Sequence, residues 1–147
     1  MRGWFERDPR DSNVIRDAKP TDASALASLQ SYLDAPSPRL LASFASLGTC
    51  LVSVVDGPTA SAGSLVGYVL LIGGDDVHLA ELVVHPAHRR EGRGRALLRA
   101  AIDRQEPGTR VTLAVAADND PARSLYESVG FRPIDYRAGF YDAESVE

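Results

Sequence analysis

Apolar and polar positions along the chain fall into blocks with two different periods. Blocks rich in β-branched and other apolar residues predict strands at 13–18, 49–56, 64–74, 77–84, 110–117 and 131–142. The loop GPTASAG joins the second and third of these blocks, which predicts a β-hairpin. The fourth block runs directly into the turn-like sequence HPAHRREGRGR.

In the first half of the chain, apolar residues also recur at helical spacing. A helix is predicted over 23–33, with Thr21 or Asp22 as its N-cap. The apolar face of this helix consists of Leu26, Leu29 and Leu33. After a segment interrupted by prolines, the sequence RLLASFASL predicts a second helix over 39–47.

A third helix is predicted directly after the arginine-rich turn. It begins near Gly94, and the pair Pro107-Gly108 ends it. Its inner face is expected to contain Leu97, Leu98, Ala101 and Ile102. The local order is therefore strand, glycine turn and helix.

The sequence DNDPARSLYESVGF predicts a fourth helix. Asn119 or Asp120 suits the N-cap, Pro121 the first turn and Gly130 the left-handed C-terminal position. Its inner face is expected to contain Ala122, Leu125, Tyr126 and Val129. Together with the strands, these helices predict a mixed α/β sheet with helices on its faces.

Length and composition are those of an ordinary globular protein. The 147 residues are 44% apolar and 24% charged, which predicts one domain over 13–147 after an N-terminal extension at 1–12. Cys50 is the single cysteine and lies in a predicted strand, so we expect a small buried hydrophobe and no acyl-enzyme. The extension has no apolar signal region, and no apolar run approaches the ~18 residues of a membrane span. A cytoplasmic protein with no membrane partner is expected.

Charge and histidine placement restrict the remaining partners. The net charge of −4 is spread along the chain, and only 89–99 is strongly cationic, which argues against a nucleic-acid partner. A nucleic-acid binder would show affinity that falls steeply with salt. His85 and His88 are accompanied by no cysteine or carboxylate pattern, so solvated turn residues and no metal are expected.

The sequence RREGRGR at 89–95 predicts an anion site. A glycine turn between a strand and a helix lets the backbone approach a ligand, and the first amides of the helix have no intrahelical partner. The helix dipole attracts an anion there, and the side chains of Arg89, Arg90, Arg93 and Arg95 add positive charge. A phosphate or pyrophosphate group is the expected ligand.

Two spaced motifs identify the kind of phosphate site. The turn lacks the G-x-x-x-x-G-K-[ST] of a Walker loop, and Leu97 stands where a dinucleotide fingerprint needs its third glycine. Arg89-x-x-Gly92-x-Gly94 resembles instead the acetyl-CoA signature of the GNAT superfamily of N-acetyltransferases. The segment from Asn119 to Phe131, with Leu125-Tyr126 and Gly130, resembles that family's second signature. The resemblance in element order runs from about Val14 to Tyr141.

The resemblance implies acetyl-CoA as cosubstrate and a mostly antiparallel, splayed sheet. The pantetheine arm would pair with backbone groups of Leu82, Val83 and Val84. The pyrophosphate would be held by amides of Arg89, Arg90, Glu91, Gly92, Arg93, Gly94 and Arg95. Asn119 would contact the pantetheine or simply cap its helix, and these two readings are equally good.

The resemblance also implies an acid and a base. It makes the phenol of Tyr126 the proton donor to the departing CoA thiolate, although an inner-face tyrosine is also an ordinary core residue. The acceptor amine must lose a proton before it attacks, and an imidazole, which titrates near ~6.5, suits that task. His78 is preferred as the base over Glu81, because a strand of period two places them on opposite faces. Catalysis through ordered water remains open.

The acceptor is expected to be a primary amine attacked directly in a ternary complex. The tail GFRPIDYRAGFYDA is similar to the branch that acetylates ribosomal protein N-termini, with Arg137 and Tyr141 matching its pattern. Ala114 stands where that branch usually has a glutamate, so small amines and polyamines stay open, as does an acyl-CoA-sensing module without turnover. Tyr32 and Asp34 are candidate acceptor contacts. Both a monomer and a homodimer are compatible with the sequence.

Overall fold

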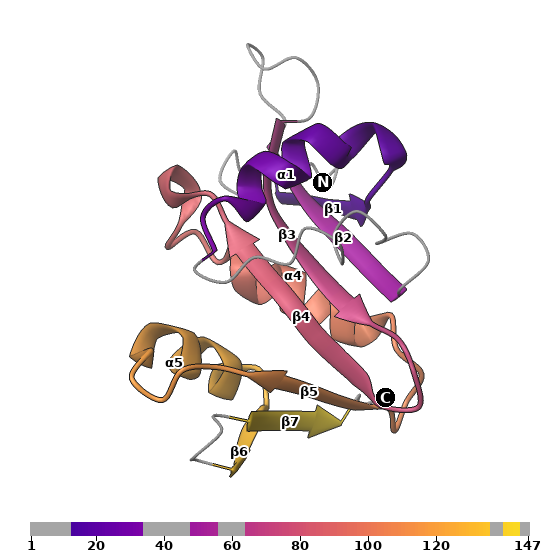
Figure 1. Cartoon of the computed structure of the whole chain (residues 1–147), viewed down its shortest axis with the longest axis vertical. Coiled ribbons are helices and arrows are strands. Elements are labelled where there is room, and N and C mark those ends of the chain that lie inside the picture. The colour runs from indigo at the N-terminus through magenta and orange to yellow at the C-terminus, as the bar shows by residue number, and fades with distance from the viewer. Residues whose placement is uncertain (1–12, 34–47, 56–63, 136–139, 145–147) are drawn as a thin grey trace, which may run out of the picture.

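A single mixed sheet forms the centre of the protein. The computed structural model describes residues 13–33, 48–55, 64–135 and 140–144. Seven strands within these residues form one sheet in the order β1-β2-β3-β4-β5-β7-β6 (Figure 1). Their bounds are Asn13–Asp17 (β1), Gly48–Val55 (β2), Ser64–Ile72 (β3), Val77–Val84 (β4), Arg110–Ala114 (β5), Arg132–Asp135 (β6) and Phe140–Glu144 (β7).

The sheet is mostly antiparallel and splayed, as the family resemblance implies. Every neighbouring pair is antiparallel except β4 and β5, which run parallel. Only two residue pairs join these parallel strands, Val77 with Val111 and His78 with Thr112. Beyond them the two strands diverge (Figure 1), and the backbone of β4 is left without a strand on one side.

Helices cover both faces of the sheet. On one face, α1 (Ala23–Gln30) packs over β3 and β4. On the other, α4 (Arg93–Asp103) and α5 (Asp120–Ser128) cover a second core that holds all the predicted inner-face residues of these two helices. Short 3-10 turns, η2 (Pro20–Asp22) and η3 (Pro86–His88), precede α1 and follow β4. The predicted mixed α/β architecture is confirmed.

The local signals at the ends of α5 are confirmed. The Asn119 side chain accepts a hydrogen bond from the amide of Ala122 at 3.3 Å, and Pro121 lies in the first turn. Gly130 has a φ of +103°, the left-handed conformation expected after a helix. At the other predicted cap, Asp22 occupies the N-cap of α1, but its carboxylate is directed to the Lys19 amide and the Arg16 guanidinium.

Some predicted boundaries are wrong. The helix of 23–33 ends at Gln30, and the strand of 110–117 ends at Ala114. The segment 131–142 contains two strands, because β6 pairs back antiparallel onto β7 with Arg132 opposite Asp142. The extension at 1–12 and the predicted helix at 39–47 lie outside the described residues.

Candidate active site

The backbone edge of β4 that faces the gap is the first part of the site. The amide of His85 donates to the carbonyl of Val66 on β3 at 2.7 Å. In an antiparallel pair of strands, hydrogen-bonded residue pairs alternate with residue pairs that are not hydrogen-bonded. Val83 therefore also directs its backbone groups toward β3, whereas Leu82 and Val84 direct theirs into the gap. The Val84 carbonyl accepts a bond from the Arg89 Nε at 3.0 Å. Of the three residues expected at the pantetheine, Leu82 and Val84 therefore present their backbone groups to the gap.

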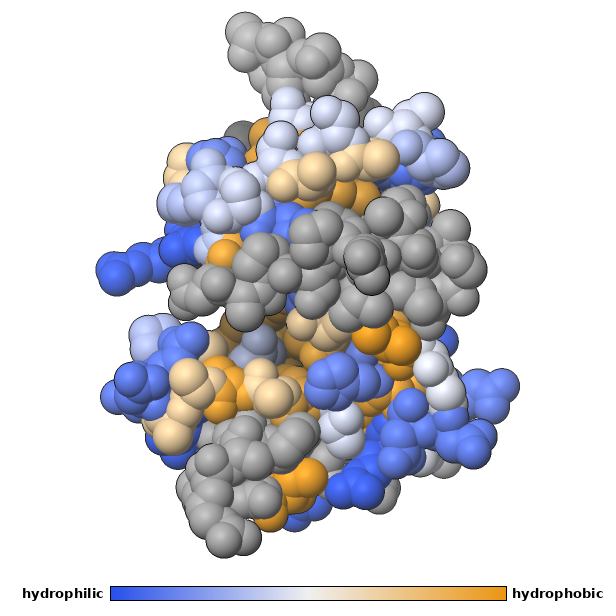
Figure 2. All heavy atoms as spheres, in the orientation of Figure 1, coloured by the Kyte–Doolittle hydropathy of each residue, from blue (hydrophilic) through white to orange (hydrophobic). Residues whose placement is uncertain are grey.

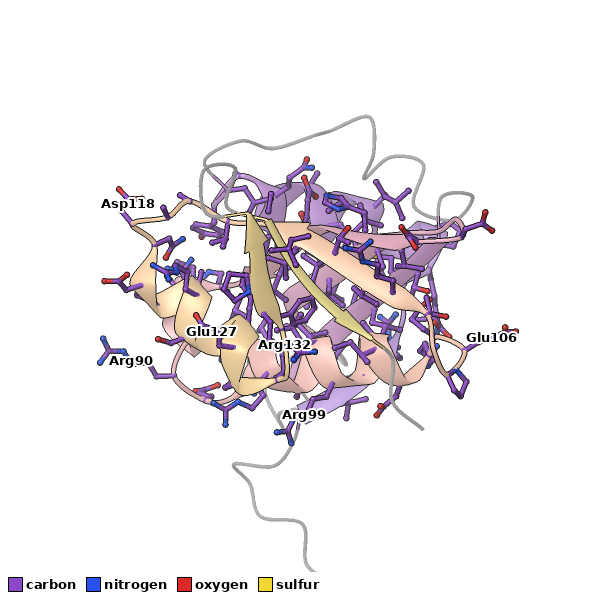
Figure 3. The ribbon with its side chains drawn as sticks, turned by 90° about the horizontal axis from the view of Figure 1, so that it is seen from below. Arg90, Arg99, Glu106, Asp118, Glu127 and Arg132 are labelled. Atoms are coloured by element: carbon purple, nitrogen blue, oxygen red, sulfur yellow. The ribbon has the colours of Figure 1, made fainter. Side chains whose placement is uncertain are left out.

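The glycine turn lies at the open end of this gap. Gly92 is the N-cap of α4 and has a φ of +77°, which is left-handed. A Cβ placed on Gly92 would meet no atom within 4 Å, so the space beside it is open. Arg90 is also left-handed, with a φ of +65°, and its side chain points away from the body of the protein (Figure 3).

The amides that follow this turn are suited to bind an anion. The first intrahelical bond is donated by Ala96 to the Gly92 carbonyl at 3.0 Å, so the amides of Arg93, Gly94 and Arg95 precede the helical hydrogen-bond ladder. The positive end of the helix dipole lies at the same point. The open space, the left-handed glycine and these amides fit the pyrophosphate of a CoA molecule.

One of the four arginines does not add its side-chain charge to this turn. Arg93 is only 6% exposed, and its Nη1 donates to Ser53 Oγ on β2 at 3.2 Å while its Nε donates to Glu91 at 2.8 Å. The expectation that the Arg93 side chain adds positive charge for a bound anion is therefore corrected, because a buried serine and a neighbouring carboxylate bind its guanidinium. Hydrogen bonding to Arg93 lowers the pKa of Glu91. Arg89, Arg90 and Arg95 remain exposed.

Helix α5 brings Tyr126 beside the same region. Its neighbour Leu125 lies 3.4 Å from the Cβ position of Gly94, so α5 packs against the beginning of α4. Tyr126 is 9% exposed and meets Phe131 edge to face, with ring centroids 5.8 Å apart. Burial raises the pKa of Tyr126 to about 12, so the phenol keeps its proton throughout the neutral range.

A bulge in β4 changes the expected placement of the two candidate bases. The pairing of β3 with β4 shifts register between Leu70 and Leu71, so that Leu71 faces Leu79 while Leu70 faces Glu81. Leu79 belongs to the core under α4, whereas Glu81 bonds to Tyr68 and Gln30 on the α1 side. His78 stands between Val77 and Leu79, which both belong to the core under α4, so the His78 side chain also faces the α1 side. The prediction that His78 and Glu81 lie on opposite faces is wrong, because the bulge breaks the period of two.

Glu81 lies in a buried polar cluster. Its side chain is 5% exposed and accepts bonds from the Tyr68 hydroxyl at 2.8 Å and from Gln30 Nε2 at 3.0 and 3.1 Å. Tyr68 is completely buried, and burial together with Glu81 raises the pKa of its phenol far above the ordinary range. These three hydrogen bonds hold the carboxylate group of Glu81 in one orientation.

The His78 side chain is half-buried at the inner end of the gap. Its Nδ1 lies 3.0 Å from Thr112 Oγ1, at the point where β4 and β5 last pair. Figure 2 shows apolar atoms at the floor of an indentation on this face, between the parts of the molecule that contain β4 and β5. The site thus consists of the glycine turn, the backbone edge of β4, the buried phenol of Tyr126 and the imidazole of His78. These parts lie along or beside the diverging strands β4 and β5.

Comparison with known proteins decides the family. Residues 16–131 match the model of the acetyltransferase (GNAT) family. The chain belongs to the GNAT family. The GNAT residues at 16–131 run from β1 through α5 and include the gap, the turn and Tyr126.

Curated relatives of this GNAT chain include named N-acetyltransferases. The N-alpha-acetyltransferase RimI of Mycobacterium tuberculosis is 40% identical over 92 residues, which cover 59% of this chain and 58% of that protein. The [ribosomal protein bS18]-alanine N-acetyltransferase of Escherichia coli K12 is 41% identical over 69 residues, covering 46% of this chain and 47% of that protein. The chain therefore spans about half the length of these relatives.

Solved GNAT structures share the fold. The ribosomal-protein-S18-alanine N-acetyltransferase of Escherichia coli superposes with a TM-score of 0.73 at 23% identity, over 92% of this chain and 95% of that one. The CoA complex of YhbS from Escherichia coli superposes with a TM-score of 0.73 at 20% identity, over 97% of this chain and 86% of that one. These likenesses support the splayed sheet and the covering helices.

Other expectations for this GNAT chain have mixed outcomes. Cys50 is buried, and burial raises the pKa of its thiol to about 12, as expected of an unreactive core residue. His85 accepts a bond from the Ala87 amide at 3.0 Å and contacts the exposed Tyr32, so it is part of a structured turn. Asp34 and Arg137 lie outside the described residues.

Within the described residues, two further features can be stated. No group of three or more histidine, cysteine, aspartate or glutamate side chains is arranged to hold a metal ion. None of the helices there has both the length and the apolar character that crossing a membrane would require.

Sequence reasoning missed several residues of this GNAT site. Ser53, Tyr68, Gln30 and Thr112 hold Arg93, Glu81 and His78 in place. Each of these contacts joins residues that lie between 13 and 51 positions apart in the chain, so no local pattern indicates them. Side chains alternate between the two faces of β5, so Thr112 lies on the face opposite to the buried Val111 and Leu113. This alternation is the one signal in the sequence that could have indicated Thr112.

Proposed function

We propose that the protein transfers the acetyl group of acetyl-CoA to a primary amine by direct attack in a ternary complex. The observation that carries this proposal is the left-handed Gly92 turn, with the amides of α4 facing open space, at the mouth of the gap between β4 and β5. Acetyl-CoA supplies an acetyl group activated as a thioester. The backbone of Leu82 and Val84 and the amides of 93–95 would hold it.

Residues of this chain provide the proton transfers. His78 takes the proton that the amine must lose, through the ring nitrogen that does not contact Thr112. The nitrogen then forms its bond to the acetyl carbon while the carbon–sulfur bond breaks. Tyr126 gives its proton to the departing sulfur, for which its protonated phenol is suited. Glu81 is the alternative base, because it shares the face of His78.

The acceptor we propose is the N-terminal amine of a protein. The support comes from two relatives, the N-alpha-acetyltransferase RimI and the [ribosomal protein bS18]-alanine N-acetyltransferase. An α-amine titrates near ~7.7 and a lysine amine near ~10.4, so an imidazole base is better matched to an N-terminus. Small-molecule amines form the competing acceptor class. We also propose that the protein acts in the cytoplasm and without a metal.

The test of this function is acetyl-CoA-dependent thiol release with a panel of N-terminal peptides, lysine peptides, polyamines and arylalkylamines. CoA binding is measured in parallel by calorimetry. Turnover with N-terminal peptides is expected, and turnover only with small amines would reassign the acceptor. CoA binding without turnover on any amine would contradict catalysis and favour a sensing module.

The acid role of Tyr126 is tested by Tyr126→Phe. The substitution keeps the ring against Phe131 and removes only the hydroxyl, so the CoA dissociation constant should stay within about twofold. Turnover should fall about 100-fold, the lower range for a general acid. Ser128→Ala, which removes an exposed hydroxyl from the same helix, is the control and should leave turnover unchanged. Unchanged turnover in Tyr126→Phe would remove the acid role.

A further inference from the structure

Thr112 lies where the two diverging strands of the site last pair. It is the register partner of His78, and the neighbouring pair joins Val77 to Val111. The two valines are buried in the core under α4 and α5, so His78 and Thr112 point to the opposite face, where both are half-buried. The contact between their side chains therefore stands at the inner end of the gap.

The contact engages one of the two imidazole nitrogens of His78. His78 Nδ1 and Thr112 Oγ1 are 3.0 Å apart, which is a normal hydrogen-bond length. With Nδ1 engaged, only Nε2 is left to receive a proton. Nε2 has a free lone pair only when Nδ1 carries the hydrogen, and a threonine oxygen can accept that hydrogen.

We infer that Thr112 is a positioning residue for His78, accepting the Nδ1 hydrogen and so presenting Nε2 as the base. The inference rests on the proposed function, because it assumes that His78 removes the proton of the amine. When Nε2 becomes protonated, the ring is positively charged and its Nδ1 bond to Thr112 strengthens. Thr112 thus sets the ring orientation before the reaction and stabilises the charged ring during it.

Other titratable and charged residues lie on the elements next to this pair. Glu81 lies on the same face of β4 and is bonded to Tyr68 of β3 and to Gln30 of α1. In β7, Asp142 occupies the register position opposite Thr112, and Arg132 of β6 is the register partner of Asp142. Asp142→Asn is therefore included in the measurements, so that an effect of this neighbour on the pH profile is separated from that of Thr112.

The test compares Thr112→Val, which removes the hydroxyl at similar volume, with Thr112→Ser, which keeps it. In Thr112→Val, kcat is expected to fall about tenfold, a part of the ~100-fold or more that a general base contributes. Losing an acceptor for the charged ring disfavours that form, so the acidic limb of kcat/KM should move to lower pH. Thr112→Ser should restore both quantities, and CoA affinity should stay unchanged in all variants.

Nitrogen NMR of the imidazole rings provides a readout that does not depend on activity. The chain has three histidines, and His78→Ala assigns the signal of interest. His85 is an internal reference, because its Nδ1 accepts from the Ala87 amide and its hydrogen must lie on Nε2 in the neutral ring. His78 is expected to show the opposite tautomer, and Thr112→Val is expected to weaken that preference.

The outcomes separate the inference from the proposed function. A wild-type pH profile in His78→Ala would overturn His78 as the base and this inference with it. A profile that changes in His78→Ala but not in Thr112→Val would overturn the inference alone. An Nε2-hydrogen tautomer of His78 in the wild type would also overturn it.

Discussion

At the scale of single residues, backbone conformation is as important to this site as side-chain chemistry. Gly92 and Gly108 have nearly the same left-handed φ, +77° and +87°, and neither Cβ position meets an atom within 4 Å. They differ in place, because Gly92 caps α4 at the open gap and Gly108 lies before β5. The pair therefore separates backbone strain from loss of the anion site.

Gly92→Val is expected to lose CoA affinity by more than about tenfold, since amide contacts to a phosphate contribute about 1.5–3 kcal/mol each. Both substitutions should lower the free energy of unfolding by about 1–3 kcal/mol, the cost of a left-handed non-glycine residue. Gly108→Val, however, should retain CoA affinity. Calorimetric CoA titration and thermal unfolding of both variants measure the two quantities. Equal CoA affinity in the two variants would contradict the phosphate role of the turn.

The chain's glycines and caps were predictable at this scale, because their signals are local. Gly130, Pro121 and Asn119 have the conformations and contacts that their neighbours in sequence require. Arg93 was not predictable in the same way. Its sequence context is a cationic run, yet Ser53, 40 residues earlier, provides the partner that allows its burial.

At the scale of elements, the entry into α1 depends on one carboxylate. Asp22 accepts bonds from Arg16 at 2.8 and 3.0 Å and from the Lys19 amide at 2.7 Å, and so ties β1 to the turn before the helix. The bond from Arg16 lowers the pKa of Asp22. A lowered folded-state pKa means that this stability is present above the pKa of the unfolded chain and is lost as the pH falls through the folded value.

Asp22→Asn is expected to destabilise the protein by about 1.5–3 kcal/mol at pH 7, the range for hydrogen bonds to charged groups. The difference from wild type should shrink below about pH 4, where the unfolded aspartate becomes protonated. Asp17→Asn is the control, because Asp17 is 70% exposed and its 2.7 Å contact with Arg104 should contribute at most about 1 kcal/mol. Denaturant unfolding between pH 3 and pH 7 measures both; equal effects of the two substitutions would contradict this role.

The elements also show where sequence prediction reached its limit. Periodicity predicted β4 correctly as a strand, but the bulge that turns His78 and Glu81 to one face depends on how β4 pairs with β3. No glycine marks the bulge in the sequence VHLAELVV. Likewise, the chain reversal between β6 and β7 was missed because 131–142 carries apolar residues on both sides of it.

At the scale of the whole molecule, burial of ionisable groups couples stability to alkaline pH. Burial raises the pKa of Tyr126 and of Cys50 to about 12, and it raises that of Tyr68 further, with Glu81 adding to the effect. These groups lie in both cores, under α4 and α5 and under α1. A raised folded-state pKa leaves stability intact below the unfolded value and removes it as the pH rises toward the folded value.

We therefore expect the free energy of unfolding to fall as the pH rises from about 9 to about 11, because the unfolded thiol and phenols ionise near ~8.5 and ~10 while the folded ones do not. Each such group adds at most about 1.4 kcal/mol per pH unit. Tyr126→Phe should reduce this slope, whereas Tyr32→Phe should not, because the Tyr32 side chain is 45% exposed. Urea unfolding of the three proteins at pH 8, 9, 10 and 11 tests this. Identical slopes in Tyr126→Phe and wild type would mean that the Tyr126 hydroxyl reaches solvent in the folded state, which would also weaken its assignment as a protonated acid.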